Sequence, residues 1–115
     1  LPWQQRVRIL RDSVRALTYL HEQEPPVFHC DIKPSNILLD ERCNALLADV
    51  GMAKVAEGVK SREATQAIST VGVCGTPGYI DPLQINGLQQ SRLTDGYAMG
   101  ITALVTLTAQ PAIGL

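Results

Sequence analysis

The sequence has no surplus of positive charge. Its 115 residues include ten Lys and Arg and eleven Asp and Glu, so the formal net charge is −1. Proteins that bind nucleic acid or anionic membranes by electrostatics usually carry a basic surplus, so the composition argues against both kinds of partner. The sequence also shows no positively charged start followed by an apolar run, so no signal peptide is expected. No apolar stretch is long enough to span a bilayer.

Cysteine is scarce and irregularly spaced. The three cysteines, Cys30, Cys43 and Cys74, form no C-x-x-C pair and no Cys/His spacing of the kind that binds zinc. An odd number without a secretory signal favours reduced thiols in a cytoplasmic protein. We therefore expect free cysteines, with no structural metal and no disulfide. The remaining composition, 45% hydrophobic and 18% charged, is that of an ordinary globular protein.

Residues 3–23 are predicted to form a helix. Apolar residues recur there at steps of three and four and form one stripe: Trp3, Val7, Leu10, Val14, Leu17 and Leu20. Pro2 suits a first helical position, and Pro25 and Pro26 end the helix. The charges oppose the helix dipole, because arginines lie early and glutamates late. Packing of the apolar stripe must therefore stabilise this helix.

Residues 29–36 bring together chemical groups that suit phosphoryl transfer. They lie in a predicted loop between two short apolar strands, at 27–28 and 37–39. The Asp31 carboxylate can take a proton from an attacking hydroxyl. The Lys33 amine can neutralise phosphate oxygens, and the Asn36 amide oxygen suits Mg²⁺. Positioning and charge neutralisation are what phosphoryl transfer depends on.

A second carboxylate follows one hairpin later. The apolar runs 37–39 and 45–48 flank a polar turn, which predicts two paired strands. Asn36 then lies at the start of one strand and Asp49 at the end of the other, so both side chains emerge at one edge of the hairpin. Together they would form a Mg²⁺ site. The alternative is that Asp49 is only a turn carboxylate, because Asp-x-Gly after a strand is common.

The two motifs resemble those of the eukaryotic protein kinases. His29-Cys30-Asp31-Ile32-Lys33-Pro34-Ser35-Asn36 is similar to the catalytic loop H-R-D-L-x-x-x-N, and Asp49-Val50-Gly51 is similar to D-F-G. The catalytic-loop sequence is most similar to those of plant receptor-like kinases and the related Pelle and interleukin-receptor-associated kinases. The resemblance implies an α+β kinase fold with ATP and Mg²⁺ as cofactors. It also implies catalytic roles for Asp31 and Lys33, metal binding by Asn36 and Asp49, and structural support by His29.

Residues 52–74 lose regular periodicity and are expected to form an exposed loop, which resembles the kinase activation loop. Its hydroxyl residues are candidate phosphorylation sites: Ser61, Thr65, Ser69 and Thr70. Ordinary solvated side chains are the alternative for most of them. Many kinases pair the Arg of H-R-D with the phosphorylated loop, and the Cys30 thiol cannot make that bidentate contact. We therefore expect loop phosphorylation to be weakly coupled to activity.

A stretch rich in glycine and proline follows at 72–82. Its spacing, G-x-x-G-x-x-G, is not that of a nucleotide-binding loop, and no strand-turn-helix pattern surrounds it. It instead resembles the substrate-docking loop of plant receptor-like kinases, which implies a rigid surface for an extended substrate. The residues concerned are Gly75, Thr76, Pro77, Gly78 and Tyr79. The resemblance also implies hydrogen bonds from Thr76 toward Asp31 and Lys33.

The last predicted element is a helix from Asp95 to about Thr108, capped by Thr94. Its apolar residues lie almost all round, and about fourteen residues are too few to span a bilayer, so burial within the protein is expected. Residues 95–100 resemble the D-V-Y-S-F-G that opens the central helix of the kinase C-lobe. The resemblance implies that Asp95 braces the backbone around His29, whereas Gly96 in place of Val costs helix stability.

No Gly-rich nucleotide loop or V-A-I-K motif occurs, and no lysine precedes Lys33. The resemblance therefore implies that residues 1–115 are a partial kinase domain: a mainly helical C-lobe with a short catalytic-loop hairpin, without the N-lobe and the late C-lobe helices. The predicted function is a Ser/Thr kinase of protein substrates, in the cytoplasm or on the cytoplasmic side of a membrane receptor. The isolated chain is expected to be inactive. The alternative is a pseudokinase-like scaffold or binding module, which Val50, Leu83 and Gly96 favour as departures from the kinase pattern.

Overall fold

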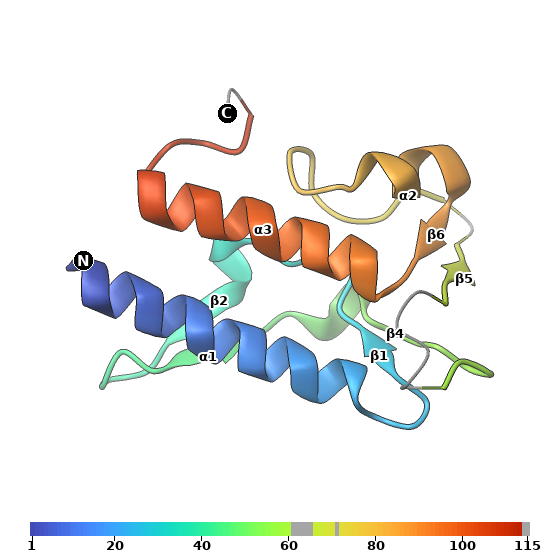
Figure 1. Ribbon diagram of the computed structural model, residues 1–115, viewed down its shortest axis with the longest axis horizontal. Coiled ribbons are helices and arrows are strands. Elements are labelled where there is room, and N and C mark those ends of the chain that lie inside the picture. Colours follow the sequence, from blue (N-terminus) through green and yellow to red (C-terminus); the bar gives the residue numbers. More distant parts are fainter. Residues whose placement is uncertain (61–65, 71, 114–115) are drawn as a thin grey trace.

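Two long helices lie side by side and dominate the molecule (Figure 1). The computed structural model describes residues 1–60, 66–70 and 72–113. Its helices are α1 (Trp3–His21), α2 (Pro82–Gly87) and α3 (Arg92–Thr108). Within this described part, no helix is long and apolar enough to cross a membrane.

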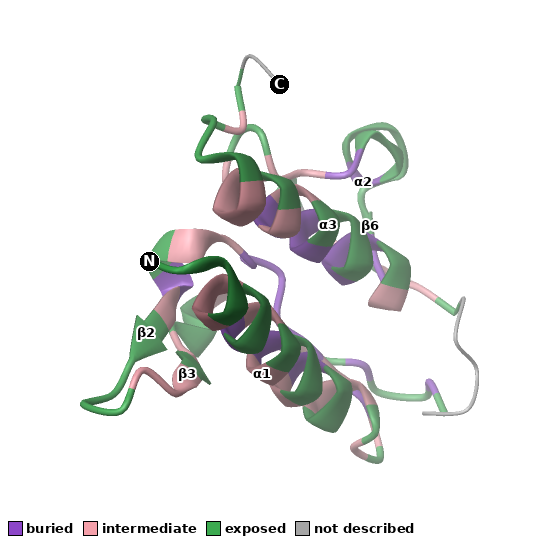
Figure 2. Ribbon diagram, turned by 60° about the vertical axis from the view of Figure 1, so that its left-hand side comes forward, coloured by how far each residue is buried: buried purple, intermediate pink, exposed green. Residues whose placement is uncertain are grey.

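Helix α1 confirms the predicted helix, but its buried face only partly coincides with the predicted stripe, of which Leu17 is buried. Its buried residues are Ile9, Ser13 and Leu17, at successive four-residue steps. Three members of the predicted apolar stripe are exposed instead: Trp3, Val7 and Val14. Figure 2 shows the buried residues of α1 along the side that faces α3 and the hairpin. The Ser13 hydroxyl donates a hydrogen bond to the Ile9 carbonyl at 2.8 Å, so a serine can occupy the middle of the buried face.

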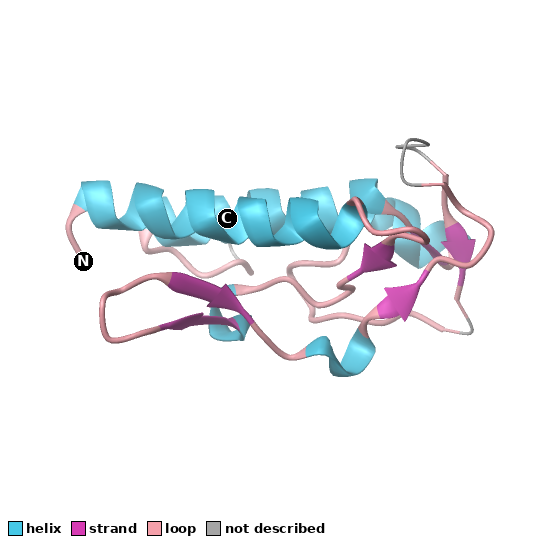
Figure 3. Ribbon diagram, turned by 90° about the horizontal axis from the view of Figure 1, so that it is seen from below, coloured by secondary structure: helices cyan, strands magenta, loops and turns pink. Residues whose placement is uncertain are grey.

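The strands form small antiparallel pairs on one side of the two long helices (Figure 3). β1 (Val27–Phe28) pairs with β4 (Lys54–Val55), and β2 (Ile37–Leu39) pairs with β3 (Ala45–Leu47). β5 (Ile68–Ser69) pairs with β6 (Gln89–Gln90). Two 3-10 turns, η1 (Pro34–Asn36) and η2 (Val50–Met52), flank the β2–β3 hairpin. The predicted hairpin is confirmed.

The segment 52–74 is more structured than its composition predicts. It contains β4 and β5, and the backbone N–H of Ala56 also donates to the Pro26 carbonyl at 2.8 Å. Strands of two residues are too short to leave a period-two pattern in the sequence. Their partners, β1 and β6, lie far away along the chain, so local propensity does not reveal the pairing.

Helix α3 begins at Arg92 rather than at Asp95. Ser91 is the N-cap, because its hydroxyl accepts a hydrogen bond from the backbone N–H of Leu93 at 3.0 Å. The Thr94 hydroxyl in turn accepts one from the Ser91 N–H at 3.0 Å. Thr94 is therefore the third helical residue of a capping box and not the cap itself.

Burial along α3 is one-sided, contrary to the expected burial all round. The buried residues are Thr94, Asp95, Ala98, Met99 and Thr102. Three large apolar residues of the helix are exposed: Leu93, Tyr97 and Leu104. The Thr102 hydroxyl donates to the Ala98 carbonyl at 2.8 Å, so the buried face includes satisfied polar residues as well as apolar ones.

Two small apolar clusters anchor the loop between β1 and β2. The first contains Leu17, Ile32, Ala98 and Met99 and so joins α1 to α3. The second contains Phe28, Cys30, Ala56 and Val59. Cys30 and Ile32 thus lie in different clusters, and Asp31 is the residue between them. The loop is fixed on both sides of its carboxylate.

Candidate active site

The Asp95 carboxylate holds the backbone of the loop in place. It accepts hydrogen bonds from the backbone N–H of His29 at 2.9 Å and of Cys30 at 3.0 Å. The imidazole Nε2 of His21, at the end of α1, lies 2.8 Å from the same carboxylate. Asp95 is only 1% exposed, so these groups take the place of water around a buried acid. The bracing contacts implied by the kinase resemblance are confirmed, and His21 is a partner that the sequence did not indicate.

The His29 imidazole connects the loop to the end of the hairpin. Its Nδ1 accepts a hydrogen bond from the backbone N–H of Asp31 at 3.1 Å. Its Nε2 lies 2.8 Å from the Ala48 carbonyl. Because Nδ1 is an acceptor, the ring proton is on Nε2 and is donated to Ala48. The fully buried ring therefore fixes the residue before Asp49 relative to Asp31.

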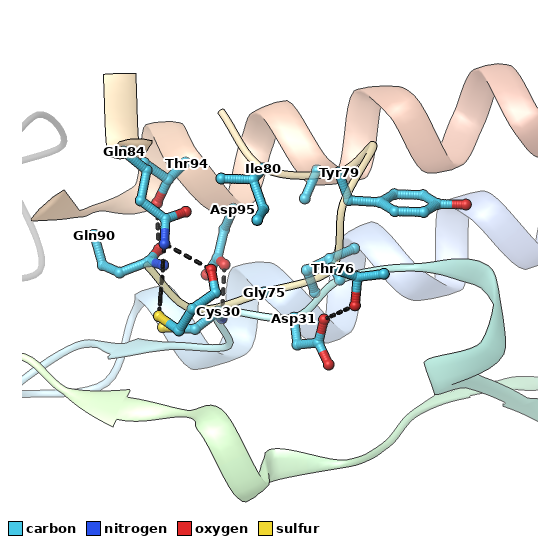
Figure 4. A pocket seen from close by; sticks show the side chains of 13 residues that line it. Cys30, Asp31, Gly75, Thr76, Tyr79, Ile80, Gln84, Gln90, Thr94 and Asp95 are labelled. Carbon is cyan, nitrogen blue, oxygen red and sulfur yellow. Dashed lines mark hydrogen bonds between the residues drawn. The ribbon is translucent and has the colours of Figure 1, made fainter. Parts of the chain in front are cut away.

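Both oxygens of the Asp31 carboxylate have partners. The Thr76 hydroxyl donates to Oδ1 at 2.7 Å (Figure 4), and the Asn36 amide donates to Oδ2 at 3.3 Å. The Lys33 ammonium lies 3.9 Å from Oδ2 and donates to the Thr76 hydroxyl at 2.9 Å. The implied contacts of Thr76 are confirmed. These four residues form one polar cluster, built from the loop before β2 and from the glycine-rich stretch.

Asn36 and Asp49 are held at the same end of the hairpin. The Ala48 N–H donates to the Asn36 carbonyl at 2.8 Å, which extends the β2–β3 ladder to the residue before Asp49. The Asn36 amide nitrogen also donates to the Asp31 carbonyl at 2.8 Å, so its amide oxygen is left for another partner. Asp49 has a left-handed backbone with φ of 57°, and its exposed carboxylate accepts a hydrogen bond from Gly51 at 3.3 Å.

The oxygen atoms of this pair fit a hard divalent cation. An amide oxygen and a carboxylate are ligands that Mg²⁺ accepts, with water and substrate phosphates completing its shell. A Cβ added at Gly51 would lie 3.2 Å from Asp49 Oδ1, so glycine leaves that oxygen uncrowded. Among the described residues, no three or more His, Cys, Asp and Glu side chains group as a metal site. A shared ion on Asn36 and Asp49 stays a prediction.

Both glycines of the stretch 75–79 have a backbone conformation that other residues rarely adopt. Gly75 has φ of 119°, and a Cβ there would lie 3.2 Å from the Ile80 side chain. Gly78 has φ of 93°, and a Cβ there would lie 3.0 Å from the Ala112 side chain. Glycine therefore suits both positions because of their positive φ. Tyr79 packs against the cluster that joins α1 to α3, and burial raises the pKa of its phenol.

The candidate phosphorylation sites differ in their surroundings. Ser61 and Thr65 lie outside the described residues. Ser69 is exposed in β5. The Thr70 hydroxyl donates to the Leu88 carbonyl at 3.0 Å, and the Thr70 N–H donates to the same oxygen at 2.7 Å. Phosphorylation of Thr70 would require its hydroxyl to leave this contact.

Two buried glutamines support the site and were not predicted. Gln84 in α2 is 3% exposed, and Gln90 in β6 is 1% exposed. The Gln84 amide donates to the Cys74 carbonyl at 2.7 Å, and the Gln90 amide oxygen accepts from the Thr94 hydroxyl at 2.6 Å. These contacts tie the segment before Thr76 to α2 and α3. Neither glutamine belongs to a motif, so the sequence offers no signal for them.

A family model described as protein kinase domain matches residues 1–114. The chain belongs to the protein kinase family. The α+β fold class expected from the sequence is confirmed by this match and by the mixture of helices and small antiparallel sheets. The assignment of residues 29–36 as the catalytic loop stays a prediction.

Plant receptor-like kinases resemble the kinase chain over almost all of its length. It is 36% identical over 114 residues to Wall-associated receptor kinase-like 20 of Arabidopsis thaliana, with 98% of this chain and 17% of that protein covered. It is 40% identical over 116 residues to Salt tolerance receptor-like cytoplasmic kinase 1 of Oryza sativa subsp. japonica, with 98% and 31% covered.

The name of a third relative includes the class of residue that is phosphorylated, serine/threonine. The chain is 40% identical over 114 residues to "Probable LRR receptor-like serine/threonine-protein kinase RPK1" of Arabidopsis thaliana, with 98% of this chain and 20% of that protein covered. The chain thus belongs to a Ser/Thr protein kinase family. It spans less than a third of the length of each of these three relatives, at 17%, 31% and 20%.

Proposed function

We propose that this chain supplies the catalytic-loop part of a Ser/Thr protein kinase, which transfers the γ-phosphoryl group of ATP to hydroxyls of protein substrates. The observation that carries the proposal is the polar cluster of Asp31, Lys33, Asn36 and Thr76. A general base must be oriented within hydrogen-bond reach of the hydroxyl that it serves. Two donors hold the Asp31 carboxylate in one orientation, Thr76 at 2.7 Å and Asn36 at 3.3 Å.

Each residue of the cluster has a distinct role in this proposal. Asp31 accepts the hydrogen bond, and then the proton, of the substrate hydroxyl. Lys33, whose side chain is 25% exposed, neutralises charge on the transferred phosphoryl group. Thr76 keeps these two side chains together, and the stretch 75–79 receives the substrate backbone beside them.

The cofactors in this proposal are ATP and Mg²⁺. Asn36 and Asp49 would hold the ion, which when bound neutralises charge on the phosphate oxygens. The contact from the His29 ring to the Ala48 carbonyl, at 2.8 Å, keeps the residue before Asp49 at a constant position relative to Asp31. This contact supports a shared role for the two carboxylates.

We also infer that the chain is the C-lobe part of a longer kinase domain whose substrates are proteins. The support is its coverage of 17% to 31% of relatives called receptor-like kinases. The proposed location is the cytoplasm, or the cytoplasmic side of a membrane receptor, and one relative is called a cytoplasmic kinase. Nucleic acid is not a proposed partner.

The proposal is tested by Asp31→Asn in the protein that carries this chain together with a nucleotide-binding lobe. Transfer of labelled phosphate from ATP to a Ser/Thr peptide library is measured with Mg²⁺ present. We expect kcat to fall by about 100-fold or more, because general-base catalysis typically contributes that much. The KM for ATP should change little, since Asp31 would act on the acceptor hydroxyl.

Asp12→Asn is the matched control, because Asp12 pairs with Arg11 on the surface of α1. It should leave kcat unchanged. Equal turnover by the Asp31→Asn variant and the unchanged protein would contradict the proposed role. A protein that binds peptide but shows no turnover at all would instead support the scaffold alternative.

A further inference from the structure

Two thiols from distant parts of the chain meet next to Asp31. Cys30 is 6% exposed and belongs to the apolar cluster with Phe28, and Cys74 packs against that cluster. Both cysteines line the same small cavity, and all cysteines of the chain are free thiols. The two backbones lie near each other, since a Cβ added at Gly75 would lie 3.4 Å from the Cys30 carbonyl oxygen. The fold therefore places a pair of thiols where the two loops of the site meet.

The two sulfur atoms have different surroundings. The Cys74 sulfur accepts contacts from the amide of Gln90 at 3.2 Å and from that of Gln84 at 3.5 Å. The Cys30 thiol donates to the Phe28 carbonyl at 3.4 Å. Burial, the Asp95 carboxylate and contact with the Cys74 thiol raise the pKa of Cys30 well above its usual range. Cys30 thus stays protonated, whereas Cys74 is only half-buried and its sulfur receives two N–H contacts, which makes it the better candidate for the first attack.

We propose that Cys30 and Cys74 form a site of reversible oxidation, at which a hydroperoxide converts the two thiols into a disulfide. The cavity that they line has a volume of about 10 Å³, which is room for roughly one water-sized molecule. A space of this size does not admit a bulky oxidant, so the oxidant that we propose is hydrogen peroxide, the smallest hydroperoxide. The site does not depend on the kinase activity proposed above.

The oxidation proceeds in two balanced steps. The Cys74 sulfur attacks one oxygen of hydrogen peroxide, the O–O bond breaks, and the leaving hydroxide takes the thiol proton to become water. Cys74 is then a sulfenic acid. The Cys30 sulfur attacks the sulfenic sulfur, the S–O bond breaks, and the hydroxyl leaves as water with the Cys30 proton. The two thiols lose two electrons, which reduce one peroxide to two waters, and an added dithiol reverses the bond.

The test uses the protein that carries this chain, purified reduced and then exposed to hydrogen peroxide. Remaining thiols are blocked with iodoacetamide, and the protein is digested with trypsin without reductant. Trypsin separates the three cysteines into the peptides 16–42, 43–54 and 63–92. We expect mass spectrometry to show 16–42 joined to 63–92, two hydrogens lighter than their sum. The joined species should disappear after treatment with dithiothreitol.

Cys43 is the internal control, because it lies in the turn of the β2–β3 hairpin, away from the other two thiols in the sequence and outside their cavity. Cys43→Ser should leave the joined peptide unchanged. In the Cys30→Ser variant, dimedone should form an adduct with the sulfenic acid of Cys74. In the Cys74→Ser variant, no dimedone adduct should form at Cys30. If a variant does not fold, the peptide map of the unchanged protein alone tests whether the Cys30–Cys74 disulfide forms. Linkage to Cys43 at equal yield, or oxidation of Cys74 beyond the sulfenic acid without linkage, would overturn the proposal.

Discussion

Thr76 links Asp31 and Lys33, the two residues that are predicted to be catalytic. Its hydroxyl donates to Asp31 Oδ1 at 2.7 Å and accepts from the Lys33 ammonium at 2.9 Å. Only a group that is both donor and acceptor can serve a carboxylate and an ammonium at once, and a hydroxyl is such a group. The orientation of Asp31 therefore depends on a residue that performs no chemistry itself.

Replacing Thr76 with Val should lower kcat by about tenfold to a hundredfold, because a hydrogen bond to a charged group contributes about 1.5–3 kcal/mol. Thr76→Ser should keep most of the activity, since it keeps the hydroxyl. Steady-state kinetics with a Ser/Thr peptide measures both variants. Thr108→Val is the control, because that hydroxyl contacts only carbonyl and N–H groups at the exposed end of α3. Equal kcat for Thr76→Val and Thr76→Ser would refute the positioning role.

Asp95 is the residue on which the loop backbone most depends. We expect Asp95→Ala to lower the free energy of unfolding by about 3 kcal/mol or more, because it leaves two buried N–H groups without an acceptor. Urea denaturation of the protein that carries this chain measures the loss. Asp12→Ala removes a carboxylate from a surface pair and should cost less than about 0.5 kcal/mol. Similar losses in the two variants would show that Asp95 does not brace the loop.

At the scale of elements, the two ends of α3 are unequal. Its start has a full capping box on Ser91 and Thr94. Its end is Ala109, which has φ of 58° and ψ of 22°, a left-handed conformation that glycine adopts more easily. The helix therefore has an optimal first turn and a strained C-cap.

Ala109→Gly should raise the free energy of unfolding by about 0.5–1 kcal/mol, because glycine removes the steric cost of the left-handed backbone. Ala103→Gly, within the same helix, should lower it by a similar amount, since glycine is a poor helix former in that position. If the left-handed backbone at Ala109 is strained, thermal melts should show a higher melting temperature for Ala109→Gly and a lower one for Ala103→Gly. A lower melting temperature for Ala109→Gly would contradict it.

At the scale of the whole molecule, both long helices expose apolar side chains. Trp3 is 59% exposed on α1, and Leu104 is 49% exposed on α3. Each large apolar side chain left in water forgoes about 1.5–3 kcal/mol of burial energy. The burial energy forgone by a few such residues is comparable to much of the free energy of unfolding of a small domain.

Residues 1–115 produced alone should associate and should transfer no phosphate from ATP. Exposed apolar surface promotes association, and the sequence contains no glycine loop or V-A-I-K lysine to hold the α- and β-phosphates. Light scattering and a radiolabel assay measure the two properties. Leu104→Lys should reduce association, while Gln110→Lys, at an exposed polar position, should not. A monomer with a cooperative melt would contradict the first expectation, and Mg²⁺-dependent turnover that Asp31→Ala abolishes would contradict the second.

Sequence reasoning succeeded where the information is local. The residue types of the loop 29–36, the turn of the hairpin and the periodicity of α1 lie within single segments, so they could be interpreted directly. The predicted buried face of α1 was only partly right: Leu17 is buried, but Ser13 is buried too, because it satisfies its hydroxyl within the helix. The roles of His21, Gln84 and Gln90 could not be predicted, because each depends on a partner that only the tertiary fold supplies.

The bonds from the loop to Asp95 also set an order of events during synthesis. Asp95 follows His29 by 66 residues and Cys30 by 65. At about 5–20 residues per second, the ribosome makes the loop roughly 3–13 s before the acceptor of its N–H groups. During that interval those groups lack the acceptor that they have in the folded protein. The segment that contains Asp31 is translated early, yet it can take its final form only after α3 has emerged.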